Sequence, residues 1–229
     1  MRRIAEGLYQ LEAGGFVNAY LIVGSADLTL VDAGHSRSAG ALAAELRDNA
    51  FDLRDIGRVV VTHAHADHVG GLRFLLGKHP IKVHAHPGDI PVLTGKAPAR
   101  RLNGFKGFCL GFLHEHLLPW LPVEMVIPAE PGRPLRGIPQ WQILHTPGHT
   151  VGSLSLFHPV KQILVCGDAL SNRGGKLHLP EECFNEDPEA LRLSVGKLSE
   201  LDCDTLCCGH GPVLRGGAFR HIEAALAKK

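Results

Sequence analysis

Short apolar runs of the length of β-strands recur along the chain. Two of them lie close together near the N-terminus, Ala19 to Val23 and Leu28 to Val31, and the intervening Gly24-Ser25 predicts a hairpin turn. Later runs, some of them alternating apolar and polar positions, predict further strands at 58–61, 81–85, 141–145, 153–157, 163–166 and 205–208. The chain therefore contains strands in both of its halves.

Apolar residues at helical spacing predict helices between these strands. Residues 38–49 carry such a pattern, and Ser38 is expected to cap that helix. Asp187 followed by Pro188 predicts the start of another helix, because aspartate caps well and proline fits the first helical position. Shorter or later helices are expected at 72–76 and 219–227.

Residues 87–139 depart from this pattern, since prolines interrupt the stretch and an apolar block lies at its centre. The block contains Leu102, Phe105, Phe108, Leu110, Phe112, Leu113, Leu117, Leu118, Trp120 and Leu121. One interpretation is a helical hairpin packed on the core or used as a dimer contact; the other is a cap lining an apolar substrate pocket. His114 and His116 lie in this block, where residues two apart on a helix diverge, so they are not counted as ligands.

Composition and charge narrow the class of protein. The chain has 229 residues, 45% of them apolar, and 24 basic residues against 23 acidic ones. This balance disfavours a nucleic-acid or membrane-surface partner. No uninterrupted apolar run reaches the length of a membrane span, and no apolar signal core follows Met1-Arg2-Arg3, so a cytoplasmic location is expected.

The cysteines are expected to be free thiols of the core. None of the six forms a Cys-x-x-Cys pair, and a reducing compartment disfavours disulfides. A zinc site built from Cys203, Cys207 and Cys208 is an alternative, but it lacks the usual ligand spacing. The full set is Cys109, Cys166, Cys183, Cys203, Cys207 and Cys208.

The densest chemistry in the chain follows the apolar run Val59-Val60-Val61. The segment Thr62-His63-Ala64-His65-Ala66-Asp67-His68 places three histidines and an aspartate within six positions. At a strand end, residues two apart point to the same side, as His63 and His65 would. Imidazole and carboxylate together suit zinc, iron or manganese better than calcium. The plainer interpretation is a set of surface or core histidines in a protein that has 15 of them.

Three other predicted strands end in a residue of the same kind beside a glycine or turn: His149, Asp168 and His210. Each alone is an ordinary turn or core-edge residue, but together they supply the complement that two metals need. Asp32 also ends a strand, and two interpretations stay open for it: a turn former, or a carboxylate that orients a ligand histidine.

Several other histidines are not expected to be ligands. His35 is interpreted as a loop residue. His84 and His86 repeat the His-x-His spacing without an acidic partner, so they are expected at the rim of the pocket, where His86 could touch substrate.

These motifs together resemble the metallo-β-lactamase-fold hydrolase superfamily. The matching segments are Val31 to Gly34, His63 to His68, Thr146 to Thr150, Gly167-Asp168 and Gly209 to Gly211, in the family's order. The resemblance implies an α/β fold, a four-layer αββα sandwich of two mixed sheets with metals at one edge. It also implies a single domain over 1–229 with an apolar, helical insertion at about 87–139.

Carried over residue by residue, the resemblance implies two divalent metal ions. His63, His65 and His149 would hold one, Asp67, His68 and His210 the other, and Asp168 would bridge them. Zinc is the default metal for such a histidine-rich set, and iron or manganese also fit.

Departures from particular branches narrow the substrate. Family members that cleave β-lactams typically lack an aspartate at the position of Asp168. The acyl-homoserine lactonase branch usually offers a tyrosine beyond that aspartate, whereas the only tyrosines here are Tyr9 and Tyr20. Glyoxalase II enzymes carry a C-terminal helical domain, and the 61 residues after Asp168 are few for one. Asp168 disfavours a typical β-lactamase, and the overall resemblance implies a glyoxalase II or lactonase-like branch that lacks these particular features.

The expected function is hydrolysis of an ester, thioester or lactone bond in a small, rather apolar molecule by a hydroxide shared between two metals. Asp67 would carry a proton to the leaving group. The alternatives are a persulfide dioxygenase with one iron on His63, His149 and Asp168, a phosphodiesterase or nuclease of the same fold, and a non-catalytic binding module. The expected partner is a small molecule, with a homodimer possible through the apolar insertion.

Overall fold

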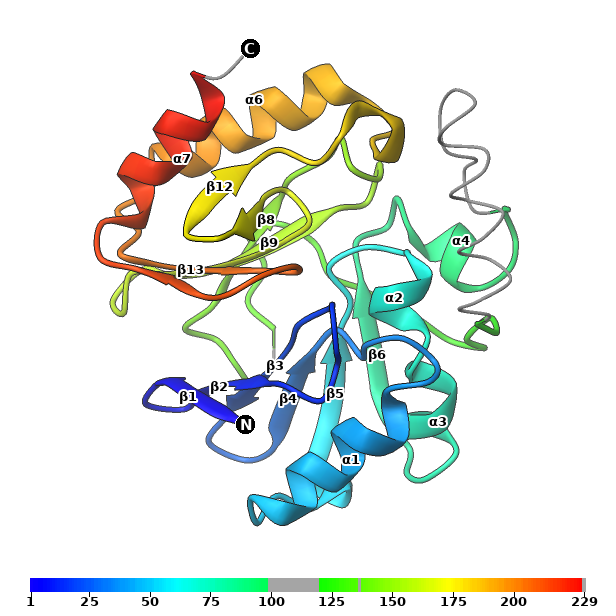
Figure 1. Ribbon diagram of the computed structural model, residues 1–229. Helices are drawn as coiled ribbons and strands as arrows, with labels where there is room; N and C mark the ends of the chain where they lie inside the picture. The colour runs from blue at the N-terminus through cyan, green and yellow to red at the C-terminus, as the bar shows by residue number, and fades with distance from the viewer. Residues whose placement is uncertain (99–119, 136, 228–229) are drawn as a thin grey trace.

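The computed structural model describes residues 1–98, 120–135 and 137–227. In Figure 1 two β-sheets face one another, and helices cover the outer face of each. The chain therefore forms the expected four layers in the order helix, sheet, sheet, helix. His114, His116 and most of the predicted apolar block lie outside the described residues.

The first sheet is built from the N-terminal half of the chain. Its order is β1-β2-β3-β4-β5-β6-β7 in the described part of the chain. The first four strands pair antiparallel, whereas β4, β5, β6 and β7 pair parallel. The strands are β1 (Arg2–Ala5), β2 (Leu8–Leu11), β3 (Ala19–Val23), β4 (Leu28–Val31), β5 (Ile56–Val60), β6 (Lys82–Ala85) and β7 (Ile127–Pro128).

The second sheet comes from the C-terminal half and has the order β14-β13-β10-β9-β8. Strands β10 and β13 pair parallel, and the other neighbours pair antiparallel. A separate hairpin is formed by β11 (Ser171–Arg173) and β12 (Lys176–His178). The strands of the second sheet are β8 (Gln142–His145), β9 (Leu154–His158), β10 (Ile163–Gly167), β13 (Thr205–Cys208) and β14 (Leu214–Arg215).

The helices divide between the two outer faces. Figure 1 shows α1 and α3 on the side of the first sheet, and α6 and α7 beyond the second. The helices are α1 (Ala39–Asp48), α2 (Ala66–Val69), α3 (Leu72–Leu76), α4 (Ile90–Leu93), α6 (Pro188–Ser199) and α7 (Ala218–Leu226), with the 3₁₀ turns η1 (Leu53–Asp55) and η2 (Glu182–Phe184).

Side-chain alternation along the strands creates three apolar cores, one between each pair of layers. On β3, Tyr20 and Ile22 pack between the two sheets, whereas Leu21 packs in the core that also contains Leu42 of α1. Cys207 of β13 likewise faces the opposite sheet. Because successive strand residues point to opposite faces, both sheets can be apolar on both sides.

Two helix starts test the capping predictions. Asp187 accepts a hydrogen bond from the Ala190 N–H and caps α6, as predicted. Ser38 is the N-cap residue of α1, as predicted, but its side chain makes no capping hydrogen bond, because its hydroxyl donates to the His35 carbonyl at 3.0 Å. Its backbone is already near the helical region (φ −91°, ψ −13°), and a capping side chain requires an extended backbone.

The described part of 87–139 contains both a helix and a strand. Helix α4 follows β6, and β7 adds a parallel strand to the edge of the first sheet through Ala85 and Pro128. Proline is tolerated there because an edge strand needs fewer ladder donors. This strand was not predicted from the sequence.

Hydrogen bonds join the two sheets at the end where β5, β10 and β13 terminate. The Leu154 N–H donates to the Thr62 carbonyl at 2.9 Å, and the Asn18 N–H donates to the Gly209 carbonyl at 2.7 Å. The buried Tyr20 hydroxyl donates to the Cys208 carbonyl at 2.6 Å. These bonds hold the strand ends of one sheet against those of the other.

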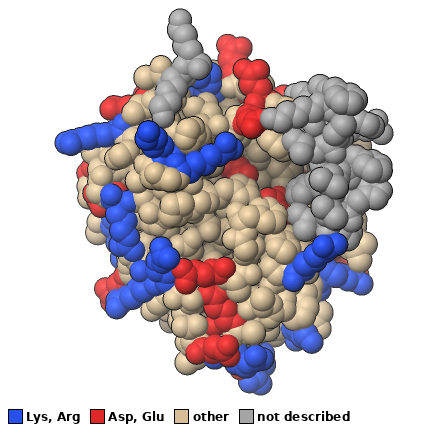
Figure 2. Space-filling model, in the orientation of Figure 1, with Lys and Arg blue, Asp and Glu red and all other residues tan. Residues whose placement is uncertain are grey.

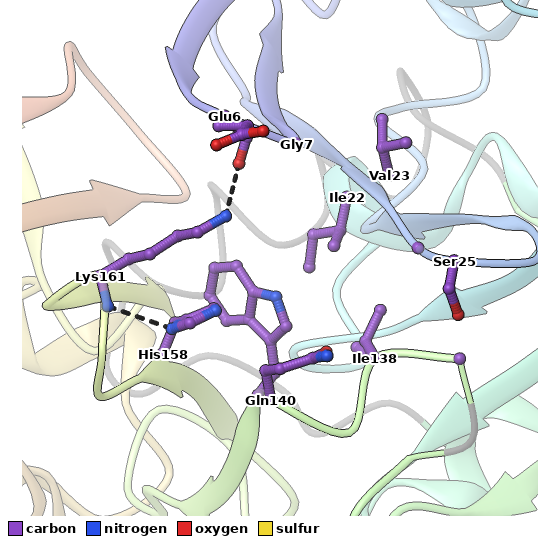
Figure 3. Close-up of a pocket in the computed structure, with 12 residues that line it drawn as sticks. Glu6, Gly7, Ile22, Val23, Ser25, Ile138, Gln140, His158 and Lys161 are labelled. Atoms are coloured by element: carbon purple, nitrogen blue, oxygen red, sulfur yellow. Dashed lines mark hydrogen bonds between the residues drawn. The ribbon is translucent and has the colours of Figure 1, made fainter.

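A cavity of about 290 Å³ lies at the opposite end of the sandwich, where β3 and β9 terminate. Trp141 and Ile22 contribute to its lining, and the Lys161 ammonium donates to the Glu6 carbonyl at 2.7 Å across it (Figure 3). In the described residues none of the groups able to hold a metal lies there. Among the described residues, the groups that could hold a metal lie at the other end.

None of the described helices has the length and apolar character needed to cross a membrane. The described cysteines, Cys166, Cys183, Cys203, Cys207 and Cys208, are all free thiols, as predicted, and Cys109 lies outside the described residues. Burial raises the pKa of the Cys203 thiol to about 12 and that of Cys207 well above its usual range. Such thiols are protonated at neutral pH and are poor metal ligands.

Candidate metal centre

One short segment presents four of the candidate ligands. Strand β5 ends at Val60, and His63 follows in the buried connection to α2. His65 has an extended backbone (φ −104°, ψ 148°) and is the N-cap residue of α2, whose first turn carries Asp67 and His68. The chain therefore changes from strand to helix inside the motif, which brings both pairs of side chains to the same end of the sandwich.

The first group of potential ligands consists of His63, His65 and His149. One ligand atom from each lies within 4.8 Å of the others. His149 Nε2 is 2.9 Å from His65 Nδ1. His149 comes from the loop after β8, so this group joins the two sheets.

The second group consists of Asp67, His68 and His210. It satisfies the same 4.8 Å limit. The Asp67 Oδ2 atom is 3.3 Å from His210 Nε2 and 3.8 Å from His68 Nε2. His210 follows β13, so this group also combines residues from both halves of the chain.

Asp168 lies between the two groups. Its Oδ2 atom is 3.6 Å from His149 Nε2, 4.0 Å from His63 Nε2 and 3.2 Å from His210 Nε2. Its Oδ1 atom is 3.4 Å from His68 Nε2. All seven residues selected from the sequence therefore converge on one place, with Asp168 reaching both groups.

Several buried atoms of this cluster have no hydrogen-bond partner in the described structure: His63 Nε2, His68 Nε2 and Asp168 Oδ1. Buried polar groups are normally satisfied, because leaving one without a partner is costly. Imidazole nitrogen and carboxylate oxygen are the donors that zinc, iron and manganese accept. The cluster therefore fits divalent metal ions.

The second ring nitrogen of each of four histidines bonds to a neighbouring group. His63 Nδ1 is 3.1 Å from the Thr62 hydroxyl, His149 Nδ1 donates to the Asn185 side-chain oxygen at 3.0 Å, and His210 Nδ1 donates to the Phe16 carbonyl at 2.8 Å. His68 Nδ1 donates to Asp32 at 2.8 Å. Such contacts fix the ring orientation and leave the other nitrogen for a metal.

Of the two interpretations of Asp32, the structure supports the carboxylate that orients a histidine. Its backbone adopts a left-handed conformation (φ 60°) directly after β4. Its buried carboxylate accepts hydrogen bonds from the Thr62 N–H, the Thr62 hydroxyl and His68. Asp32 thus orients a candidate ligand histidine.

Burial separates the protonation states of the histidines. Burial, followed by repulsion from neighbouring histidines, holds the pKa of His63 well below its usual range and lowers that of His65 to about 3. Burial also opposes the charged form of His68, but Asp168, Asp32 and Asp67 outweigh it and raise its pKa well above the usual range.

The same opposition applies to His210 and the acidic residues. Burial lowers the pKa of His210, yet Asp168 and Asp67 raise it to about 10. Burial disfavours the ionised carboxylate of Asp168, but His210 and His68 bring its pKa well below the usual range. The nearby carboxylates therefore favour the protonated forms of His68 and His210.

Several histidines outside the cluster of seven residues contact other partners. His86 stacks on His145 with ring centres 3.8 Å apart, and its Nδ1 accepts a hydrogen bond from the Gly88 N–H. His35 stacks on Phe16 at 5.4 Å. Among the described residues, neither His35, His84 nor His86 belongs to a group that could hold a metal.

Sequence reasoning missed Asn185 and Phe16 as parts of the centre. Asn185 lies just after η2, and the Phe16 loop precedes β3. Nothing in their local sequence pointed to His149 or His210. Their contacts exist only because the chain returns to the same edge of the sandwich.

The model of the metallo-beta-lactamase superfamily matches residues 13–210, which include all seven residues of the cluster. The chain belongs to the metallo-beta-lactamase superfamily. Among similar members, the probable metallo-hydrolase YflN of Bacillus subtilis is 29% identical over 87% of this chain and 81% of its own length. A hydroxyacylglutathione hydrolase of Hahella chejuensis is 30% identical over 80% of this chain, which spans 57% of that relative.

Solved structures of the superfamily share the fold. The metallo-beta-lactamase family protein TTHA1429 of Thermus thermophilus superposes with a TM-score of 0.75 at 21% identity, covering 98% of this chain and 80% of that one. The protein TTHA1623, solved in a di-iron-bound form, gives a TM-score of 0.67 at 27% identity, covering 87% and 89%. Superfamily membership together with the His/Asp cluster implies divalent metals and a hydrolase.

Proposed function

We propose that the chain is a hydrolase with two divalent metal ions that cleaves an ester, thioester or lactone bond in a small molecule. His63, His65 and His149 would hold one metal, Asp67, His68 and His210 the other, and Asp168 both. The observation that carries the proposal is the convergence of these seven residues with three buried ligand atoms that lack hydrogen-bond partners. Zinc is the proposed metal, and iron or manganese suits the same donors.

When bound, two such cations supply an activated water at neutral pH and polarise the substrate oxygen. The protein's own contribution is orientation and proton transfer. Only 7% of Asp67 is exposed, and its carboxylate lies 3.3 Å from His210. We propose that Asp67 accepts at Oδ2 the proton that the attacking water releases and delivers it to the leaving group.

The entrance to the site favours a substrate with an apolar part. Phe16 is 57% exposed, and its ring lies parallel to that of His210, with ring centres 6.0 Å apart. Its other neighbour in the stack is His35. An exposed aromatic ring next to a proposed metal ligand offers an apolar surface to an acyl or leaving group.

The surface charge disfavours a nucleic-acid substrate, and the relatives favour a small thioester or ester. On the face shown in Figure 2, Lys and Arg side chains are interspersed with Asp and Glu instead of forming a basic band. Nucleic-acid partners normally require clustered positive charge. The similarity to a hydroxyacylglutathione hydrolase supports thioesters and related esters as first candidates.

The test combines metal analysis with a substrate panel. Purified protein is expected to contain two metal ions per chain and to hydrolyse at least one ester, thioester or lactone in preference to phosphodiesters. His63→Ala should lose metal and turnover together. His221, an exposed residue of α7, offers a matched control, and His221→Ala should retain both.

Three results would contradict the proposal. One iron per chain with oxygen-dependent turnover would favour a persulfide dioxygenase. Salt-sensitive binding and cleavage of RNA or DNA would favour a nuclease. Full metal content and full turnover in His63→Ala would remove the assigned ligand set.

A further inference from the structure

Asp89 is a buried carboxylate that none of the ligand groups includes. It lies just before α4, and only 3% of the residue is exposed. Its Oδ2 atom accepts hydrogen bonds from the Ala64 N–H at 2.7 Å and the Thr150 hydroxyl at 2.8 Å, and its Oδ1 atom accepts one from the Gly152 N–H at 2.8 Å. Burial raises its pKa, although each of these three donors favours the ionised form.

The three donors belong to two loops that carry potential ligands of the same metal. Ala64 lies between His63 and His65, and Thr150 directly follows His149. Asp89 therefore joins one backbone amide of the first loop to a hydroxyl and an amide of the second. His65 and His149, one from each loop, are in contact although they lie 84 residues apart in the sequence.

The second loop is folded tightly around the carboxylate. The Thr150 N–H donates to the Ser153 hydroxyl at 2.9 Å, which closes a turn beside Asp89. A Cβ atom on Gly152 would lie 2.4 Å from the Asp89 Oδ1 atom, so only glycine fits there. Its backbone can approach the carboxylate because it has no side chain.

Other contacts hold the ligands in different ways. The Leu154–Thr62 backbone bond joins the start of β9 to the segment after β5, and Asn185 holds the His149 ring from the second half of the chain. Asp32 bonds to Thr62 and His68. Asp89 differs from these because its side chain bonds directly to both the loop of His63 and His65 and the loop of His149.

We propose that Asp89 is a positioning residue that sets the separation between the His63–His65 pair and His149, and thereby the affinity for the first metal. The proposal rests on the two-metal function proposed above. It assigns each half of the centre its own buried carboxylate, Asp89 for the three-histidine group and Asp32 for the group containing His68.

Asp89→Asn tests this with little change of volume. An asparagine offers one oxygen acceptor and one NH₂ donor in place of two acceptors. In one orientation the NH₂ faces the Gly152 N–H, and in the other it faces the Ala64 N–H. Either way a backbone donor is left against another donor, so one of the two loops must move.

The experiment titrates metal-free wild type and variants with cobalt(II), following the visible spectrum, and measures zinc affinity by competition with a chelator. Wild type is expected to bind two ions. Asp89→Asn should bind the second ion normally and the ion of the three-histidine group about 10–100-fold more weakly, with an altered spectrum for that ion. Thr150→Val removes the hydroxyl that donates to Asp89 and should show a smaller loss of affinity in the same binding step. This variant replaces Asp89→Asn in the test if Asp89→Asn does not fold.

Asp27→Asn is the matched control. Asp27 accepts hydrogen bonds from the buried Arg58 guanidinium at 2.7 and 2.6 Å, near the turn between β3 and β4. The Asp27→Asn variant should have lower thermal stability but unchanged affinity in both metal-binding steps. Restoring Asp at position 89 must restore the affinity.

The outcomes separate this inference from the proposed function. If wild type binds no metal, the two-metal function fails. If wild type binds two ions and Asp89→Asn binds both with unchanged affinity and spectrum, the positioning role is wrong. It is equally wrong if both steps weaken alike, or if Asp27→Asn reproduces the loss.

Discussion

The Asp32 carboxylate accepts a hydrogen bond from Nδ1 of His68 at 2.8 Å, and both side chains are almost completely buried. This contact aims the opposite ring nitrogen, Nε2, at Asp67 and Asp168. A carboxylate behind a ligand imidazole fixes its tautomer and increases its basicity. Asp32 therefore links the end of β4 to the candidate metal centre.

Replacing Asp32 with Asn should weaken binding of the metal ion proposed for Asp67, His68 and His210 by about 10–100-fold. Asparagine tolerates the left-handed backbone of Asp32, so the fold should persist. Its amide cannot accept all three hydrogen bonds now made to the carboxylate. Zinc affinity measured against a chelator checks this, and an unchanged second binding step would contradict it.

The metal-free protein should be most stable near pH 6.5. His210, with its pKa raised from 6.5 to about 10, contributes stability that is fully present below 6.5 and is lost as the pH rises through about 10. His65, with its pKa lowered to about 3, contributes the opposite slope, because the unfolded chain takes up its proton as the pH falls below 6.5. Each group gives at most about 1.4 kcal/mol per pH unit.

Thermal unfolding of the metal-free protein between pH 5 and 10 measures this dependence. The variant His210→Ala should flatten the alkaline side and leave the acidic side in place. A stability that rises steadily from pH 6.5 to 10 in the metal-free wild type would show that the pairing of His210 with Asp67 and Asp168 is wrong.

Gly209→Ala should disrupt the centre even though the substitution adds only a methyl group. A Cβ atom there would lie 2.1 Å from the Asp168 Oδ1 atom and 2.7 Å from the His68 ring. Asp168 or the β13 terminus must move, so metal content should fall. Elemental analysis of the purified variant is the measurement.

Gly196→Ala is the control for that substitution. Gly196 lies within α6, and a Cβ atom there meets nothing within 4 Å. Alanine in a helix interior is favoured over glycine by roughly 0.5–1 kcal/mol, so this variant should be more stable with unchanged metal content. Normal metal content in Gly209→Ala would mean that the strand end yields easily.

Tyr20→Phe should cost only about 1 kcal/mol of unfolding free energy. The Cys208 carbonyl that accepts from the Tyr20 hydroxyl also accepts from the Asn18 amide at 2.9 Å, so it keeps a partner. Asn18→Ala should cost more, at least about 2 kcal/mol, because that side chain also bonds to Gln10 and Gly211. Urea unfolding of both variants gives the comparison, and the reverse order would contradict this account.

The sequence by itself determined the features that depend on neighbouring residues. The apolar runs of β3, β4, β10 and β13 were recognisable because a strand is defined by a few consecutive positions. The His63–His68 segment was recognisable because its three histidines and one aspartate lie within six consecutive positions. The capping role of Asp187 was also predictable, because it depends on residues within one helical turn. The Ser38 side chain makes no capping bond, because the backbone of Ser38 already lies in the helical region.

The tertiary structure alone decided which distant groups orient the candidate ligands and join their loops. Asp32 meets His68 across 36 residues, Asn185 meets His149 across another 36, and Asp89 reaches Thr150 across 61. These contacts depend on how the ends of two sheets are set against each other, and no local pattern encodes that arrangement. The physical reason is that the three cores fix the position of the layers, and the strand ends then meet wherever the packing brings them.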